Sequence, residues 1–158
     1  MAAGPARAVD RECRERRQGH DTDQPLPAIG RTTFIIHAIV AVAVGLPLLA
    51  APLWFGGLFG WASQPDLQPV LRAFGALMLL FGGLTSFYGI RAPNWALVDY
   101  IVRGERAYLA VQTLVFALAG LTGVGPALGN WLFAAVSAVL FVLFAATFAA
   151  RPRITQPG

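Results

Sequence analysis

Three long stretches of this chain carry no charged residue: residues 32–65, 73–90 and 107–150. A helix rises 1.5 Å per residue, so about 20 apolar residues are enough to cross the hydrocarbon core of a bilayer. Over the whole chain 56% of the residues are hydrophobic and 13% are charged, whereas a soluble domain carries about 25% charged residues. The sequence therefore predicts an all-α protein of the membrane.

The first two stretches each supply one membrane-spanning helix. The third is too long for one helix, and it contains Gly123-Val124-Gly125-Pro126 followed by Gly129-Asn130, a composition typical of turns. It is therefore divided into two helices. We predict four spans, at about residues 33–53, 70–90, 107–124 and 131–150.

The segments outside the spans differ in charge. Residues 1–32 hold more than half of the charged residues of the chain and are too polar to form a packed core, which predicts a disordered tail. The arginines lie in this tail, in the 91–106 connection and in the final residues 151–158, whereas the 124–130 connection has none. Because basic connections stay on the cytoplasmic side, both tails of the transmembrane domain (33–150) are predicted to be cytoplasmic, in a bacterial-type cell membrane.

The connection before the third span has two interpretations. Trp95, Val98, Ile101 and Val102 follow Pro93-Asn94 and could form a short amphipathic helix on the inner surface of the membrane. The same residues could instead be an early start of the third span. The sequence leaves both interpretations open.

Glycine recurs every seven residues in the second predicted span, at Gly75, Gly82 and Gly89. Small residues let membrane helices approach closely, and a repeat of seven is the spacing of a left-handed bundle. Gly45 occupies a comparable position in the first span. We therefore predict a left-handed bundle of four helices in which these glycines form the packing surface.

The few polar side chains within the spans lie at a common depth. Counted from the nearest arginine at 1.5 Å per residue, they fall roughly 6–9 Å from the inner boundary of the membrane. Polar groups at such positions are uncommon and are candidates for function: they would bind a headgroup, a quinone-like ring or a proton, or else lock neighbouring helices together by hydrogen bonds. This predicted layer contains His37, Ser86, Gln112 and Thr147, with Tyr88, Glu105 and Tyr108 just below them.

Depth does not decide which way a side chain faces. At 100° per residue, Gln112 lies about 160° around its helix from Ala110. If Ala110 marks the packing face of the third span, Gln112 points away from the bundle.

Arg72 is a separate candidate at the outer end of the second span. It shares a helix face with Gly75, three residues further along. Buried there, its guanidinium would bind an anionic group of a ligand or lipid. The alternative is that the side chain extends to the outer headgroups.

Several classes of function lack support in the sequence. We find no catalytic motif, no metal-binding spacing around the two histidines and the single cysteine, and no continuous basic patch for nucleic acid. Haem is disfavoured because Met78, the only partner for His37 within a span, lies about 10 Å deeper in the membrane. We predict no cofactor, no metal and no catalytic residue, and as partners the lipid bilayer and a second copy or a larger membrane complex.

The run Leu71-Arg72-Ala73-Phe74-Gly75-Ala76-Leu77-Met78-Leu79-Leu80-Phe81-Gly82-Gly83 resembles the second helix of small four-span bacterial membrane proteins. In that grouping, which includes DoxX-like and several uncharacterised families, the helix carries Arg-x-x-Gly followed by further glycines. The resemblance covers residues 33–150 in topology. It implies a fold and no particular activity.

Three functions are consistent with these features, and the first is the one we predict, with the other two as alternatives. The first is a non-enzymatic accessory subunit or self-associating bundle. The second is a carrier or binding protein for a small amphipathic molecule, with the inner polar layer and Arg72 as its contacts. The third is an intramembrane isomerase or redox enzyme that uses His37, Glu105 or a tyrosine as acid or base. A cavity that contains both His37 and Gln112 would favour the second or the third over the first.

Overall fold

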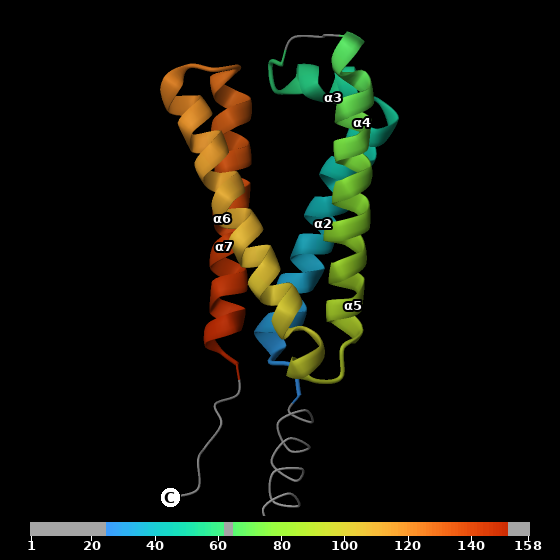
Figure 1. The fold of residues 1–158 in the computed structure, drawn as a ribbon, viewed down its shortest axis with the longest axis vertical. Coiled ribbons are helices and arrows are strands. Elements are labelled where there is room, and N and C mark those ends of the chain that lie inside the picture. Colours follow the sequence, from blue (N-terminus) through green and yellow to red (C-terminus); the bar gives the residue numbers. More distant parts are fainter. Residues whose placement is uncertain (1–24, 62–64, 152–158) are drawn as a thin grey trace, which may run out of the picture.

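The computed structural model describes residues 25–61 and 65–151, and every regular element in these ranges is helical (Figure 1). The all-α prediction is therefore confirmed. Most of the two predicted tails lies outside the described residues. In chain order the elements are α2 (Ala28–Ala50), α3 (Pro52–Leu58), the 3₁₀ turn η1 (Pro65–Leu67), α4 (Gln68–Leu77), the π-helical segment η2 (Met78–Leu84), α5 (Thr85–Arg91), the 3₁₀ turn η3 (Trp95–Leu97), α6 (Asp99–Thr122) and α7 (Ala127–Ala149).

In the part of the chain that the structure describes, three helices are long and apolar enough to cross a membrane: α2, the continuous helix Pro65–Arg91 that comprises η1 to α5, and α7. This agrees with the predicted membrane location. The remaining long helix, α6, has 24 residues, and its first turns carry Asp99, Arg103, Glu105 and Arg106. These charges explain why α6 is less apolar than the other three.

Helix α2 begins earlier than the sequence predicts. Residues 28–32, assigned above to the disordered tail, form its first turns directly after Pro27. Leu26 is buried, and a Cβ atom added at Gly30 would lie 3.1 Å from Leu26 and 3.2 Å from Thr147 of α7. Burial against α7 thus orders a segment whose composition alone favours disorder, and the predicted tail is shorter by these residues.

The connection before α6 is a single 3₁₀ turn, η3, and not a separate surface helix. The backbone N–H of Leu97 donates to the side-chain oxygen of Asn94 at 3.4 Å. Helix α6 then starts at Asp99 and ends at Thr122, where Gly123 takes the left-handed conformation (φ 68°) that terminates many helices. Of the two interpretations of this connection, the early helix start is the one observed.

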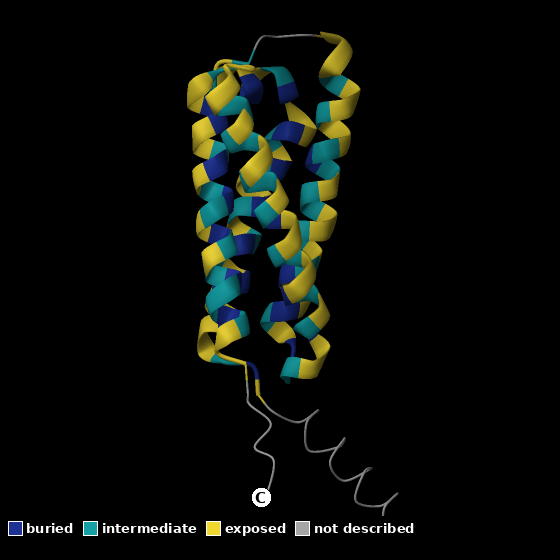
Figure 2. Ribbon diagram, turned by 60° about the vertical axis from the view of Figure 1, so that its left-hand side comes forward, coloured by how far each residue is buried: buried dark blue, intermediate teal, exposed yellow. Residues whose placement is uncertain are grey.

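The long helices form two pairs that meet along α2 and α7. Helix α6 packs along α7, while α4, η2 and α5 pack along α2. The pairs lie close together at the end where α2 begins and α7 ends, and they diverge toward the end that contains α3 (Figure 1). Burial follows this arrangement, because the inward helix faces are buried and the outer faces exposed (Figure 2). Several side chains are fully buried near the end where the two pairs lie close together. They include Phe34, Val98, Val102 and Phe144.

The repeated glycines of the second long helix all face α2. A Cβ atom added at Gly82 would lie 3.0 Å from the Cβ of Ala41, and one at Gly89 would lie 2.5 Å from the ring of Phe34. One at Gly75 would overlap the backbone of α2. At Gly75 the separation of the two helices therefore requires glycine, because backbone atoms occupy the space that a side chain would need.

Candidate functional site

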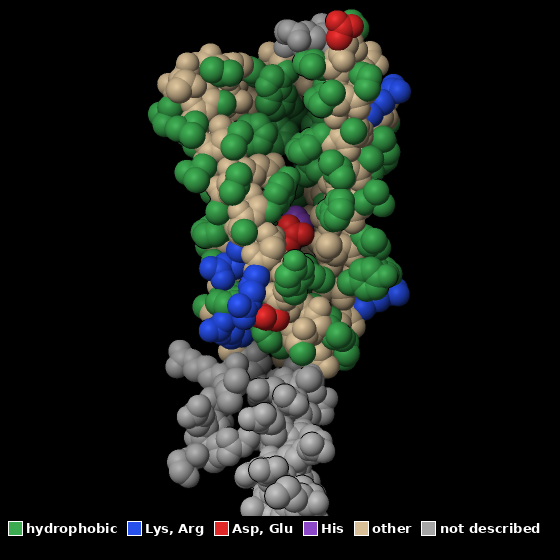
Figure 3. All heavy atoms as spheres, viewed as in Figure 1, with side chains coloured by type: hydrophobic (Ala, Val, Ile, Leu, Met, Phe, Trp, Pro, Cys, Tyr) green, Lys and Arg blue, Asp and Glu red, His purple; other side chains and the backbone are tan. Residues whose placement is uncertain are grey.

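A pocket of about 690 Å³ lies between the two helix pairs. Side chains from α2, α4, η2, α6 and α7 line it, and most of them are apolar. The outer surface is hollowed at this place, with a histidine and an acidic side chain next to each other in the hollow (Figure 3). The pocket is thus accessible from the side of the bundle as well as enclosed by it.

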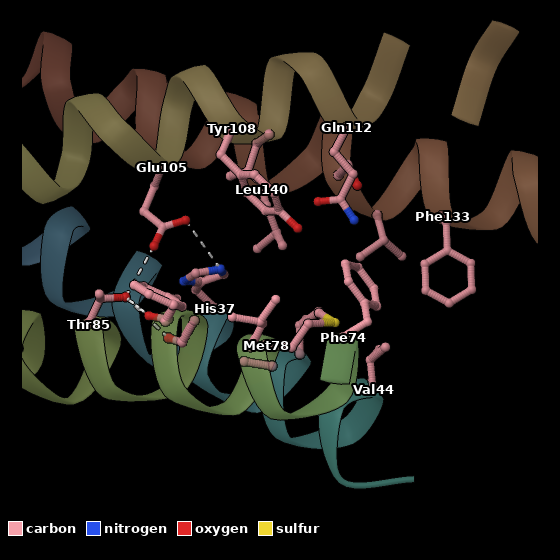
Figure 4. A pocket seen from close by; sticks show the side chains of 18 of the residues that line it. His37, Val44, Phe74, Met78, Thr85, Glu105, Tyr108, Gln112, Phe133 and Leu140 are labelled. Atoms are coloured by element: carbon pink, nitrogen blue, oxygen red, sulfur yellow. Dashed lines mark hydrogen bonds and ion pairs between the residues drawn. The ribbon is translucent and has the colours of Figure 1, made fainter. Parts of the chain in front are cut away.

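One end of the pocket is polar. His37 on α2 is 5% exposed, and its Nδ1 lies 2.9 Å from the hydroxyl of Ser86 on α5. Its Nε2 lies 3.8 Å from Oε2 of Glu105 on α6. A neutral imidazole has one donor and one acceptor nitrogen, so in the tautomer whose Nδ1 accepts from Ser86, the Nε2–H is directed at Glu105. Three helices therefore contribute to one polar cluster (Figure 4).

Thr85 completes this cluster from α5. Its hydroxyl lies 3.1 Å from Oε1 of Glu105 and also contacts the carbonyl oxygen of Phe81. The hydroxyl has a single proton, which serves one acceptor at a time. The distance from His37 to Glu105 exceeds that of a direct hydrogen bond. The Glu105 carboxylate therefore keeps most of its hydrogen-bonding capacity for another group.

Gln112 and Tyr108 also line the pocket. Together with Glu105 they occupy one face of α6, because they follow it by seven and three residues. Figure 4 shows the three side chains above the pocket, with Glu105 at the polar end. Gln112 thus points into the pocket, contrary to the orientation expected if Ala110 marks the packing face. His37 and Gln112 share one cavity.

The opposite end of the pocket is aromatic. Phe59 and Phe133 line it, and their ring centroids lie 5.5 Å apart in an edge-to-face arrangement. Phe133 also stacks on Phe116 of α6 at 5.4 Å. Because Phe59 follows α3, these rings connect α3 to α6 and α7 at the end where the helix pairs diverge.

The π-helical segment η2 forms part of the wall. Met78, Phe81 and Gly82, all within η2, line the pocket. A π-helical segment is wider than an α-helix and occurs frequently at functional sites. It precedes Thr85 directly, so the irregular part of this helix lies beside the polar cluster.

The remaining residues of the predicted polar layer lie elsewhere. Thr147 is fully buried outside the pocket, where its hydroxyl lies 2.9 Å from that of Thr33. Tyr88 is 61% exposed and packs edge-on against Phe87. Arg72 is exposed at the end of the molecule opposite the other arginines of the described residues. The predicted layer is thus divided into the pocket cluster, a threonine pair and an outward-facing tyrosine.

The predicted layer omits three polar residues that line the pocket or join neighbouring helices. Thr85 contacts Glu105, Thr33 contacts Thr147, and Ser137 is buried in the lining of the pocket. Thr85 adjoins Ser86 in the sequence, and this proximity is the signal that could have identified it. Threonine and serine are common in membrane helices, where they bond to their own backbone, so neither residue stands out by type.

No group of three or more histidine, cysteine, aspartate or glutamate side chains in the described residues is arranged to hold a metal ion. Comparisons with protein-family models, with curated proteins and with solved structures find no match to this chain. The resemblance of residues 71–83 to DoxX-like proteins therefore stays a prediction.

Proposed function

We propose that this chain is a membrane protein of four spans that binds a small amphipathic molecule in the pocket between its helix pairs. Helix α6 would be the fourth span. It is as long as its neighbour α7 and packs along it, and its charged residues lie only in its first turns. The glycine spacing of seven residues favours a left-handed bundle.

Both termini would lie in the cytoplasm. The arginines of the described residues gather at the end of the molecule where α2 begins and α7 ends, which we call the basic end (Figure 3). Arg72 is the exception. Since basic segments remain on the cytoplasmic side, the basic end would face inward and α3 outward.

The observation that carries the proposed function is the combination of size and polarity in one pocket. Its volume of about 690 Å³ lies within the range of ligand sites, about 300–1,000 Å³. His37 and Glu105 lie at one end, and Phe74 and Phe133 toward the other (Figure 4). A molecule with one polar group and an apolar body matches this distribution.

An accessory or self-associating bundle has less support. The glycines that could bring two copies together, Gly75, Gly82 and Gly89, pack against α2 of the same chain. An enzyme would need the same bound molecule beside His37 and Glu105. Binding is therefore the function common to the pocket-based alternatives.

The test is native mass spectrometry of the protein extracted in a mild detergent, with the released small molecules identified. In the variant Gly104→Leu the new side chain enters open space, because a Cβ at Gly104 meets no atom within 4 Å, and Gly104 lines the pocket. We expect wild type to retain a small amphipathic molecule and Gly104→Leu to lose it.

The matched control is Gly83→Leu. A Cβ at Gly83 also meets no atom within 4 Å, but Gly83 does not line the pocket, so this variant should retain the molecule. Equal retention by both variants would contradict binding in the pocket. A co-purifying protein complex without any small molecule would instead support the accessory function.

A further inference from the structure

The polar end of the pocket is acidic. Glu105 is the one carboxylate in the lining, and the described lining residues include no arginine; the chain contains no lysine. The side chain of Glu105 is 12% exposed. An ionised carboxylate in such surroundings is costly unless a cation or several donors compensate it, and the described residues supply the Thr85 hydroxyl and a histidine nitrogen at 3.8 Å.

The two arginines nearest to Glu105 in the sequence contact Phe148. Arg103 and Arg106 place their guanidinium carbons 5.4 Å and 4.4 Å from the ring centroid of Phe148 on α7. Arg103 also pairs with Asp99 at 2.9 Å. Phe148 does not line the pocket. The guanidinium groups of Arg103 and Arg106 therefore lie toward α7, whereas the carboxylate of Glu105 faces the pocket.

Aromatic side chains also line the pocket near its acidic end. Tyr108 lies one turn beyond Glu105 on α6, and Phe81 lies one turn before Thr85 on the facing helix; both line the pocket. Phe74 lies further from Glu105, toward the opposite end of the pocket (Figure 4). Aromatic faces attract cations, and the attraction strengthens when water is excluded. The carboxylate and the rings thus favour the same sign of charge in a ligand.

We propose that the bound molecule is a lipophilic ammonium ion, an organic amine with one positive charge and an apolar body. Its nitrogen would pair with the free acceptor positions of Glu105, and its body would extend toward Phe74 and Phe133. The lateral opening of the pocket provides entry from the bilayer, where such molecules concentrate. This inference rests on the proposed function and specifies the class of ligand.

The test compares three probes with the same twelve-carbon chain: dodecylamine, dodecanol and dodecanoate. The full chain is reconstituted in nanodiscs of zwitterionic phosphatidylcholine, and binding is measured at neutral pH against empty nanodiscs, which correct for partition into lipid. We expect wild type to bind dodecylamine about tenfold more tightly than dodecanol, equivalent to one ion pair of about 1.4 kcal/mol, and dodecanoate most weakly.

Glu105→Gln removes the charge and keeps the shape of the side chain. It should abolish the preference for dodecylamine and leave the binding of dodecanol unchanged. Asp99→Asn is the matched control, since Asp99 is on the same helix but pairs with Arg103 outside the pocket. This control should keep the wild-type preference.

The outcomes separate the two proposals. If wild type binds dodecanol or dodecanoate as tightly as dodecylamine, or if Glu105→Gln keeps the preference, the pocket binds amphipathic molecules but the ammonium ion is the wrong class. If none of the probes binds above the empty nanodiscs, the proposed function fails as well.

Discussion

The backbones of α4 and α2 approach closely at Gly75 and Gly45. A Cβ atom added at Gly75 would come within 2.7 Å of the carbonyl oxygen of Gly45 and within 2.6 Å of the amide nitrogen of Leu49. Both neighbours are backbone atoms, which cannot move aside as a flexible side chain does. The separation of the two helices at this point therefore requires glycine in α4.

Gly75→Ala should destabilise the protein by about 1–3 kcal/mol, the usual cost of overpacking. The measurement is the free energy of unfolding in mixed micelles, followed by circular dichroism. Gly83→Ala is the control on the same continuous helix, since a Cβ at Gly83 meets no atom within 4 Å. If the two variants are equally stable, the close approach does not contribute to the fold.

Thr33 and Thr147 join α2 to α7 by a hydroxyl–hydroxyl hydrogen bond of 2.9 Å, and both are fully buried. A double-mutant cycle with Thr33→Val and Thr147→Val should give a coupling energy of about 0.6 kcal/mol, the mean for such bonds between membrane helices. Valine keeps the shape of threonine, so the cycle reports the hydrogen bond.

The control cycle pairs Thr33→Val with Thr122→Val. Within residues 25–61 and 65–151, the hydroxyl of Thr122 donates to one acceptor, the carbonyl oxygen of Leu118 in its own helix, at 2.8 Å. Its coupling to Thr33 should be close to zero. A coupling of equal size in both cycles would mean that the threonine pair adds nothing specific to the contact between α2 and α7.

The four-span topology predicts that the two ends of α6 lie on opposite sides of the membrane. In a Cys13→Ala background, a cysteine at exposed Leu97 precedes α6 and one at exposed Val124 follows it. An impermeant maleimide added to intact cells should label Val124→Cys and leave Leu97→Cys unlabelled. Equal labelling of the two positions would exclude α6 as a span.

Much of the helical framework could be predicted from local features. The charge-free stretches mark apolar helices, and the described residues contain three helices of sufficient length and apolarity to cross a membrane. The glycines and the proline at 123–126 mark the break between α6 and α7, where Gly123 takes a left-handed conformation. Gly129 and Asn130, predicted to belong to the same turn, lie inside α7 instead. These features depend on nearest neighbours along the chain, so the sequence is enough to recognise them.

The candidate site could be predicted only in part. The count of depth placed His37 and Ser86 in one layer and Glu105 just below it, and the structure brings these three together. The same count included Thr147 and Tyr88, which face away from the pocket. Depth measures position along a helix, whereas facing depends on how each helix is rotated against its neighbours.

What the sequence by itself determined is that the chain is helical, apolar over lengths that match a bilayer, and basic mainly toward one end. These properties follow from residue type and from the rise of a helix. The tertiary structure alone decided that α6 packs along α7. It also decided that a pocket remains between these helices and α4 and η2, with the carboxylate of Glu105 inside it. The physical reason is that helices in lipid associate through the fit of surfaces distant in the sequence, such as Gly75 against Gly45.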